Sequence, residues 1–187
     1  ARTCPAQLRE RLFYLAGRAS EVEASGAAYV VGQTSSSGFP VTAGASDPSS
    51  LGGHGCVTKL SPQGASLVYG TLLGGTTSAD QAWAIAVDAT GRAYVTGYTN
   101  SGDFPTTSGS FDPSYNGSTD AFVTTLNPAG SGLIFSTYLG GHQPGGSDIA
   151  LSIDVDELGH AYLARYTHSV AFPTTLGGFD GQSLGSQ

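Results

Sequence analysis

Short runs of apolar residues recur along the chain, and each run is bounded by glycine, proline, serine or asparagine. Runs of this length, separated by turn-forming residues, are typical of short β-strands. In residues 82–87 the large side chains of Trp83, Ile85 and Val87 alternate with alanines. A strand that is bulky on one face and small on the other fits between two closely packed sheets. In this part of the chain the predicted strands are 82–87, 93–99, 120–126 and 133–139.

A hairpin turn is expected between the first two of these strands. Asp88 can accept hydrogen bonds from the turn backbone, and Gly91 allows the positive φ that such a turn requires. A longer loop, residues 100–119, separates the second strand from the third. Its Phe104 and Phe111 are expected to pack against the domain, since long loops without a function usually do so.

The same pattern occurs three times in the chain. The segments that begin at Val22, Val87 and Val155 each read apolar, acid, two variable residues, Gly, one variable residue, Ala, Tyr and apolar. A Phe-Pro pair follows each segment, at Phe39, Phe104 and Phe172. Self-similarity of this kind predicts tandem structural repeats.

Four strands in each repeated unit are the plan of a β-propeller blade. The predicted fold is therefore all-β, with four-stranded antiparallel sheets that form two complete blades and a partial third. The repeats are expected over residues 22–187, divided into 22–81, 82–149 and a partial unit at 150–187. Residues 1–21 are predicted to be an N-terminal extension that contains either a strand near residues 11–17 or a short helix over residues 5–16. Three blades do not close a ring, so the chain is either a fragment or one of several chains that complete it.

Residues 84–141, with the motifs AVDATGRAYVTG and DFPTT, resemble the SBBP repeat, a bacterial repeat of the seven-bladed β-propeller type. The resemblance extends over roughly residues 22–185. It implies a propeller fold in a secreted or cell-surface protein, and it supplies no catalytic residues. The chain departs from the pattern at Arg165, where the other units have Gly32 and Gly97, and at Asp154. Asp154 and Arg165 are expected to pair with each other across their hairpin.

The formal net charge of −7 limits the choice of partners. An acidic surface repels phosphate groups, so neither nucleic acid nor an anionic membrane surface is expected as a partner. No apolar run approaches the roughly 18 residues of a membrane span. The expected location is extracellular, periplasmic or at the cell surface. Because the sequence has no Met and no signal peptide, it is expected to be a processed product or a segment of a longer protein.

Cys4 and Cys56 are the only cysteines in the sequence. They form a disulfide in an oxidising compartment, or both are free and Cys56 is a small core residue. Both alternatives stay open at the level of sequence.

A calcium site is one candidate for the loop that enters the third strand. Oxygen-bearing side chains occur at alternate positions, with a glycine at the sixth position, as in a calcium loop. The acid expected at the twelfth position is replaced by Val123. The alternative interpretation is a glycine-containing turn. The candidate ligands are Asp112, Ser114, Asn116 and Asp120.

Other possible sites are weaker. Residues 181–185 match the G-x-S-x-G pattern of a nucleophile elbow, but no strand–turn–helix context surrounds them. The histidines have no partner at metal-ligand spacing, and His160, in a turn, is expected at the surface. These histidines are His54, His142, His160 and His168.

The predicted function is that of a non-catalytic, structural or protein-interaction subunit of a larger assembly, with no cofactor other than calcium. One alternative is a glycan-binding, lectin-like propeller that uses Tyr98, Tyr115 or Tyr166. The other is a propeller-fold glycan hydrolase or lyase, which requires two carboxylates in one cleft.

The chain is not expected to function as a lone monomer. Residues 161–167 are predicted to present an unpaired strand edge, and such edges promote association. The lateral faces of the fan are expected to expose large apolar side chains, for which other protein chains would be the partners. These side chains are Trp83, Tyr94, Phe122 and Phe135.

Overall fold

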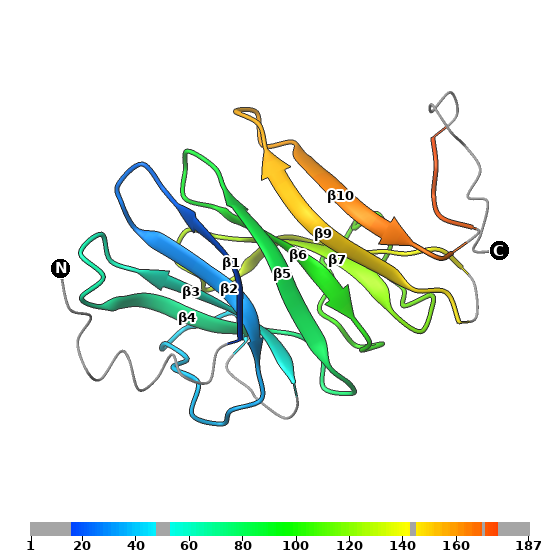
Figure 1. Ribbon diagram of the computed structural model, residues 1–187, viewed down its shortest axis with the longest axis horizontal. Coiled ribbons are helices and arrows are strands. Elements are labelled where there is room, and N and C mark those ends of the chain that lie inside the picture. The colour runs from blue at the N-terminus through cyan, green and yellow to red at the C-terminus, as the bar shows by residue number, and fades with distance from the viewer. Residues whose placement is uncertain (1–15, 48–52, 143–144, 170, 176–187) are drawn as a thin grey trace.

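The computed structural model describes residues 16–47, 53–142, 145–169 and 171–175. All regular structure in these ranges is β-strand, arranged in three antiparallel sheets that we call the first, second and third blade (Figure 1). The all-β, blade-like fold predicted from the sequence is thereby confirmed. The first blade contains β1 (Ala16–Val22), β2 (Ala28–Thr34), β3 (His54–Leu60) and β4 (Leu67–Leu73). The second contains β5 (Asp80–Val87), β6 (Ala93–Thr99), β7 (Asp120–Leu126) and β8 (Leu133–Leu139), and the third contains β9 (Asp148–Val155) and β10 (Ala161–Thr167).

The strands of the second blade agree with those predicted, except that β5 begins two residues earlier than expected. The first blade includes a strand in the region that the sequence assigned to an extension. This strand, β1, pairs with β2 from Ala16 opposite Gln33 to Val22 opposite Ala28, so it is the first strand of its own blade. Residues 5–15 of the alternative helix lie outside the described residues.

The hairpin turns form as the acid and the glycine predict. Asp88 Oδ1 accepts hydrogen bonds from the backbone N–H groups of Thr90 (2.8 Å) and Arg92 (3.0 Å), and Gly91 has a φ of 82°. The third blade repeats this turn with Asp156, which accepts from the N–H of His160 at 2.8 Å. The carboxylate therefore organises the turn that joins the first two strands of a blade.

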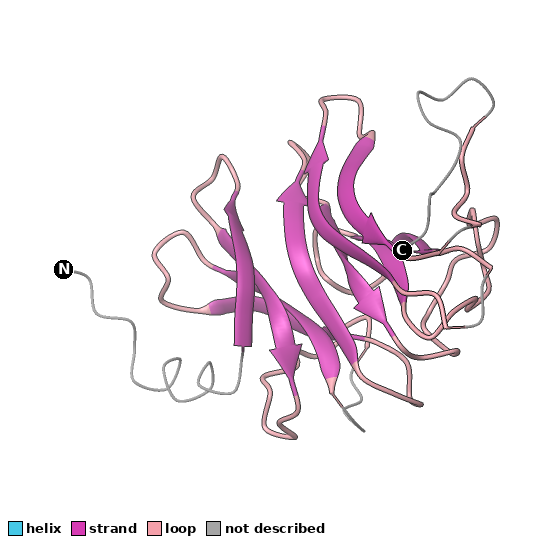
Figure 2. Cartoon of the chain, turned by 45° about the vertical axis from the view of Figure 1, so that its right-hand side comes forward, coloured by secondary structure: helices cyan, strands magenta, loops and turns pink. Residues whose placement is uncertain are grey.

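The three blades lie face to face like segments of a fan (Figure 2). Strand β5 contacts the first blade on one side and β9 of the third blade on the other. Ile85 belongs to the core shared with the first blade, whereas Ala84 and Ala86 pack in the core shared with the third. The prediction of a strand between two sheets is thus confirmed.

A β-bulge interrupts the predicted alternation at Trp83. The pairing of β5 with β6 shifts between Ala82 and Ala84, so Trp83 sits in a β-bulge. Its ring is half-buried and packs edge-on against Tyr98, with ring centroids 5.6 Å apart. A bulge adds one residue to one strand and changes the face on which a side chain lies.

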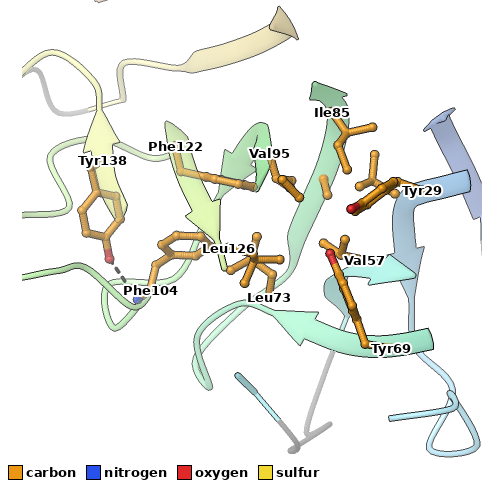
Figure 3. Close-up of a cluster of buried hydrophobic side chains, with 13 residues drawn as sticks. Tyr29, Val57, Tyr69, Leu73, Ile85, Val95, Phe104, Phe122, Leu126 and Tyr138 are labelled. Atoms are coloured by element: carbon orange, nitrogen blue, oxygen red, sulfur yellow. Dashed lines mark hydrogen bonds between the residues drawn. The ribbon is translucent and has the colours of Figure 1, made fainter. Parts of the chain in front are cut away.

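Aromatic side chains fill the core between the first two blades (Figure 3). Phe104 comes from the long loop, is 3% exposed, and packs against Phe122 with ring centroids 4.6 Å apart. The N–H of Phe104 also donates to the hydroxyl of Tyr138 at 3.0 Å. The packing predicted for Phe104 is confirmed, but the one predicted for Phe111 is wrong, since Phe111 is 65% exposed. No described strand of the third blade covers the part of the loop that holds it.

The ion pair predicted between Asp154 and Arg165 is also wrong. Asp154 lies opposite Tyr162 and is exposed, whereas Arg165 lies opposite Ala150 on another rung of the same hairpin. The guanidinium of Arg165 instead lies 3.8 Å from Asp148 Oδ1. Asp154 needs no buried partner, because no described strand covers the outer face of the third blade.

Candidate interaction surface

Each junction between blades contains a tyrosine from the second strand of the preceding blade. The hydroxyl of Tyr29 lies 2.8 Å from Glu23 Oε2 in its own blade and 3.2 Å from the carbonyl oxygen of Gly91 in the next blade. In the second blade, the hydroxyl of Tyr94 lies 3.2 Å from Asp88 Oδ2, and it lies against Gly159 in the turn of the third blade. Both tyrosines are buried, so each one joins its blade to the turn of the next.

The next blade receives the tyrosine on an aliphatic surface. Against the second blade, four residues of the third blade fill this role. Burial of a full aliphatic side chain contributes about 1.5–3 kcal/mol, so a junction of this kind can hold two blades together. The four residues are Ile153, Val155, Ala161 and Leu163.

The outer face of the third blade has the same design but lacks a cover among the described residues. Tyr162 occupies the position of Tyr29 and Tyr94, its hydroxyl lies 3.1 Å from Asp156 Oδ2, and it is 60% exposed. Leu151 and Tyr166 in the same hairpin are 48% and 47% exposed. Tyr162 and Tyr166 lie on the same face of β10 and form an apolar surface that favours association, whereas Leu151 lies in the β-bulge of β9. We call this surface the outer face.

The four apolar side chains that were predicted to be exposed belong to the second blade and not to the outer face. Tyr94 and Phe122 are 6% and 0% exposed, because the second blade is covered on both sides, so the prediction is wrong for these two. Trp83 is half-buried, and Phe135 is 36% exposed as predicted. Sequence reasoning missed Tyr162, although the repeat places a tyrosine at this position in every unit.

Buried aspartates connect consecutive blades. Asp80 Oδ2 accepts from the N–H of Gly75 (2.9 Å) at the end of the first blade and from the hydroxyl of Ser101 (3.1 Å) in the second. Asp148 repeats this arrangement with Gly141 and Ser169 at the next junction. Burial raises the pKa of Asp80, although these hydrogen bonds oppose the shift. Both aspartates belong to the scaffold that sets the spacing of the blades.

The loop before β7 brings three of the four candidate calcium ligands together. The side-chain amide of Asn116 donates to Asp112 Oδ2, and its backbone N–H donates to Asp120 Oδ2 at 2.7 Å. Ser114 is exposed, and its N–H donates to Asp112 Oδ1 at 2.9 Å. Asp120 is fully buried, and its Oδ1 has no hydrogen-bond partner among the described residues. The loop thus fills part of the candidate site with its own donors and leaves one carboxylate oxygen for a ligand.

Burial raises the pKa of Asp120 to about 6, and the nearby charges of Asp148 and Asp112 add to the shift. Within the described ranges, no group of three or more acidic, His or Cys side chains is arranged to hold a metal ion. Calcium at Asp112, Ser114, Asn116 and Asp120 therefore stays a prediction.

The remaining candidates have ordinary surroundings. His160 is exposed as predicted, with Nδ1 2.8 Å from Asp156 Oδ2, whereas His54 is buried. Cys56 is a buried free thiol whose pKa is raised by burial to about 12, and Cys4 lies outside the described residues. Residues 181–185, which match the nucleophile pattern, lie outside them too.

Two of the three tyrosines considered for glycan binding are largely committed to packing. Tyr98 is half-buried and packs against Trp83, and Tyr115 is half-buried and packs against Tyr138 with centroids 6.0 Å apart. Tyr166 is the exposed member of the three.

Four-stranded antiparallel sheets, repeated in tandem and packed face to face, define a protein of the β-propeller repeat class. Residues 68–105 match the family model of the SBBP β-propeller repeat, so the chain carries an SBBP repeat. The matched segment includes nearly all of β4 and the whole of β5 and β6, and it therefore crosses the first junction. A comparison with curated proteins finds no match to the chain. No helix in the described residues has the length and apolar character to cross a membrane.

Proposed function

We propose that the chain is a non-catalytic, extracellular or cell-surface propeller module that acts as a structural, protein-interacting subunit. The observation that carries the proposal is the outer face of the third blade. There Tyr162 has the position and hydroxyl contact of Tyr94 but is 60% exposed, whereas Tyr94 is 6% exposed under its neighbouring blade. In this proposal the outer face is a junction surface that binds another protein.

The acids support a structural role. Asp88 and Asp156 organise hairpin turns, and Asp80 and Asp148 link consecutive blades. Glu23, at the repeat position of Asp88, accepts from the hydroxyls of Ser25 and Tyr29. These carboxylates recur at equivalent places in the repeat, as a scaffold requires, whereas catalysis needs one acid whose surroundings differ from those of its copies.

A second copy of this chain offers a matching surface at its first blade. Val22, Ala28 and Val30 occupy the positions of Val87, Ala93 and Val95, which receive Tyr29 at the first junction. Val22 is 60% exposed. The isolated chain should therefore associate head to tail, first blade against third blade, when no other partner is present.

Light scattering over a concentration series tests this proposal. We expect the chain to associate as its concentration rises, and Tyr162→Ser to weaken association at least about tenfold, because central aromatic side chains dominate interface energies. Phe111→Ser is the matched control, since Phe111 is 65% exposed and lies in the loop before β7 of the second blade. A stable monomer, with amides in β9 and β10 as protected from exchange as those in β5 and β6, would show the proposal wrong. Turnover of a glycan in a hydrolase panel would overturn the non-catalytic part of it.

A further inference from the structure

A pocket of about 280 Å³ lies at the first junction, between the β1–β2 turn of the first blade and the β5–β6 turn of the second (Figure 1). Both blades are complete four-stranded sheets, so the walls of the pocket do not depend on a further blade. The pocket is lined mainly by Glu23, Ser25, Lys59, Asp88, Thr90 and Pro128.

Glu23 and Lys59 form an ion pair in this pocket. Lys59 Nζ lies 3.0 Å from Glu23 Oε2 and 4.8 Å from the centroid of the Tyr29 ring. The side chains of Lys59 and Glu23 are 12% and 17% exposed. The hydrogen bond from Ser25, together with those from Tyr29 and Lys59, lowers the pKa of Glu23, so this carboxylate is ionised at neutral pH.

The second junction does not repeat this pair. Thr125 stands at the repeat position of Lys59, which is the only lysine in the sequence. Asp88, at the position of Glu23, accepts hydrogen bonds from the backbone of its own turn. Glu23 is one methylene longer and accepts instead from Lys59 and from two hydroxyl groups. A titratable group whose surroundings differ from those of its copies is a candidate for a functional site.

The charges in the pocket are already paired, but hydrogen-bonding capacity remains. Glu23 pairs with Lys59, and Arg92 Nε lies 4.0 Å from Asp88 Oδ2. A charged ligand would compete with these pairs, whereas a neutral ligand would not. The ammonium group of Lys59 has three N–H donors, of which Glu23 uses one, and Glu23 accepts three of the roughly four hydrogen bonds that a carboxylate can accept. The pocket therefore suits neutral groups that both donate and accept, as hydroxyl groups do.

We propose that this pocket binds a single sugar residue through two adjacent hydroxyl groups. One hydroxyl donates to Glu23 Oε1, the other accepts from Lys59 Nζ, and Pro128 offers apolar surface to the C–H groups of the ring. The volume of about 280 Å³ lies just below the range of roughly 300–1,000 Å³ for drug-sized ligands, which limits the ligand to about one ring. The pocket is separate from the outer face, so the inference does not depend on the proposed contact with another protein.

The sugar is bound at this site and not cleaved. Hydrolysis needs one carboxyl group that holds a proton for the leaving oxygen. Burial opposes the shift at Asp88, but hydrogen bonds from Thr90 and Arg92 lower its pKa, and the pKa of Glu23 is lowered too. Because both acids are ionised at neutral pH, the pocket has the chemistry of a binding site.

An NMR titration of the ¹⁵N-labelled chain with glucose, galactose, mannose and N-acetylglucosamine tests the inference. We expect at least one of these sugars to shift the amide signals of Ser25, Lys59 and Thr90 in a saturable way. The expected dissociation constant is on the order of 1 mM, as for other ligands of this size. Acetate and methylammonium, which carry single charges, should not bind at the pocket.

Two substitutions take their residues from other copies of the repeat, so the fold should be kept, and circular dichroism melting checks this. Lys59→Thr removes the charged donor, and Glu23→Asp draws the carboxylate back toward its own turn. Each should weaken sugar binding about tenfold or more, because a hydrogen bond to a charged group is lost. Arg18→Thr is the matched control for charge, since Arg18 is exposed and lies outside the pocket, and it should leave binding unchanged.

Chemical modification supplies a second readout, because Lys59 is the only lysine. Bound sugar should slow the acetylation of Lys59, which mass spectrometry follows. The inference is overturned if none of the sugars gives saturable shifts at the pocket, or if the Lys59→Thr variant binds sugar as tightly as the unsubstituted chain. Binding of acetate or methylammonium at the pocket in place of a sugar would overturn it too.

Discussion

Asp120 shows how one residue can link the stability of the fold to pH. Its carboxyl group is fully buried at the start of β7, and its pKa of about 6 lies above the value of about 3.9 expected in the unfolded chain. The folded state therefore holds a proton on Asp120 that the unfolded state releases between about pH 4 and pH 6. Stability from this group is highest at low pH and falls as the pH rises through that window.

Replacement of Asp120 by Asn should remove this dependence. The amide keeps an acceptor for the N–H of Asn116 but carries no charge beside Asp112 and Asp148. We expect the variant to gain about 2–3 kcal/mol relative to the natural protein between pH 4 and pH 7.5. Urea unfolding at both pH values measures the difference, and an equal difference at the two values would contradict the assignment.

Calcium binding should favour the ionised form of Asp120, whereas burial favours its protonated form. An ion bound to Asp112, Asn116 and Asp120 would require ionised Asp120, so calcium should raise the melting temperature at pH 7.5 more than at pH 5. Asp112→Asn should reduce the effect. If a chelator leaves the melting temperature unchanged and calorimetric titration shows no heat, the calcium prediction should be dropped.

At the scale of the element, the hairpin turn is stabilised by its own hydrogen bonds and also contacts the preceding blade. Two copies of the turn, one with this contact and one without it, allow the two contributions to be measured separately. The turn at Asp88 is organised by its carboxylate and also touches the first blade through Tyr29 and Gly91. The turn at Asp156 has the same internal hydrogen bonds, but its tyrosine lies on the outer face. A matched pair of variants therefore measures what the junction adds to the turn.

Asp88→Ala should destabilise the protein by about 1–3 kcal/mol, because backbone donors in a partly buried turn lose a charged acceptor. Asp156→Ala should cost less, since water replaces the lost acceptor in the exposed turn. Denaturant unfolding of both variants tests the comparison. Equal losses would mean that the junction adds nothing to the stability of the turn.

The sequence predicted strands and turns well, because alternation and glycine position are local properties. It did not predict the bulge at Trp83, which depends on pairing with β6, or the exposure of Phe111, which depends on a neighbouring sheet. Asp154 and Arg165 were paired because they are the unusual residues of one hairpin, but register places them on different rungs. For the candidate surface, the repeat identified the tyrosine position, and only the arrangement of the blades showed which copy is exposed.

At the scale of the whole molecule, the described chain is a fan with two unlike sides. The first blade presents aliphatic side chains such as Val22, and the third presents Tyr162 and Tyr166. These sides differ in the same way as the two surfaces of an internal junction. If these two sides bind each other, as we propose, the contact joins different patches, and association would proceed head to tail until a ring closes.

The matched repeat segment, residues 68–105, is out of phase with the blades, because it joins the last strand of one sheet to the first two strands of the next. In the terms of recombination, such a segment resembles a DNA fragment with staggered, cohesive ends. At one end of the segment, β4 is the last strand of the preceding sheet. At the other end, β5 and β6 are the first two strands of a sheet that is completed by later strands. A gene that gains or loses one full repeat, from β4 to the following β7, would therefore change the number of sheets while every joint keeps its strand order. Each new copy of the repeat would therefore carry the residues that join neighbouring blades.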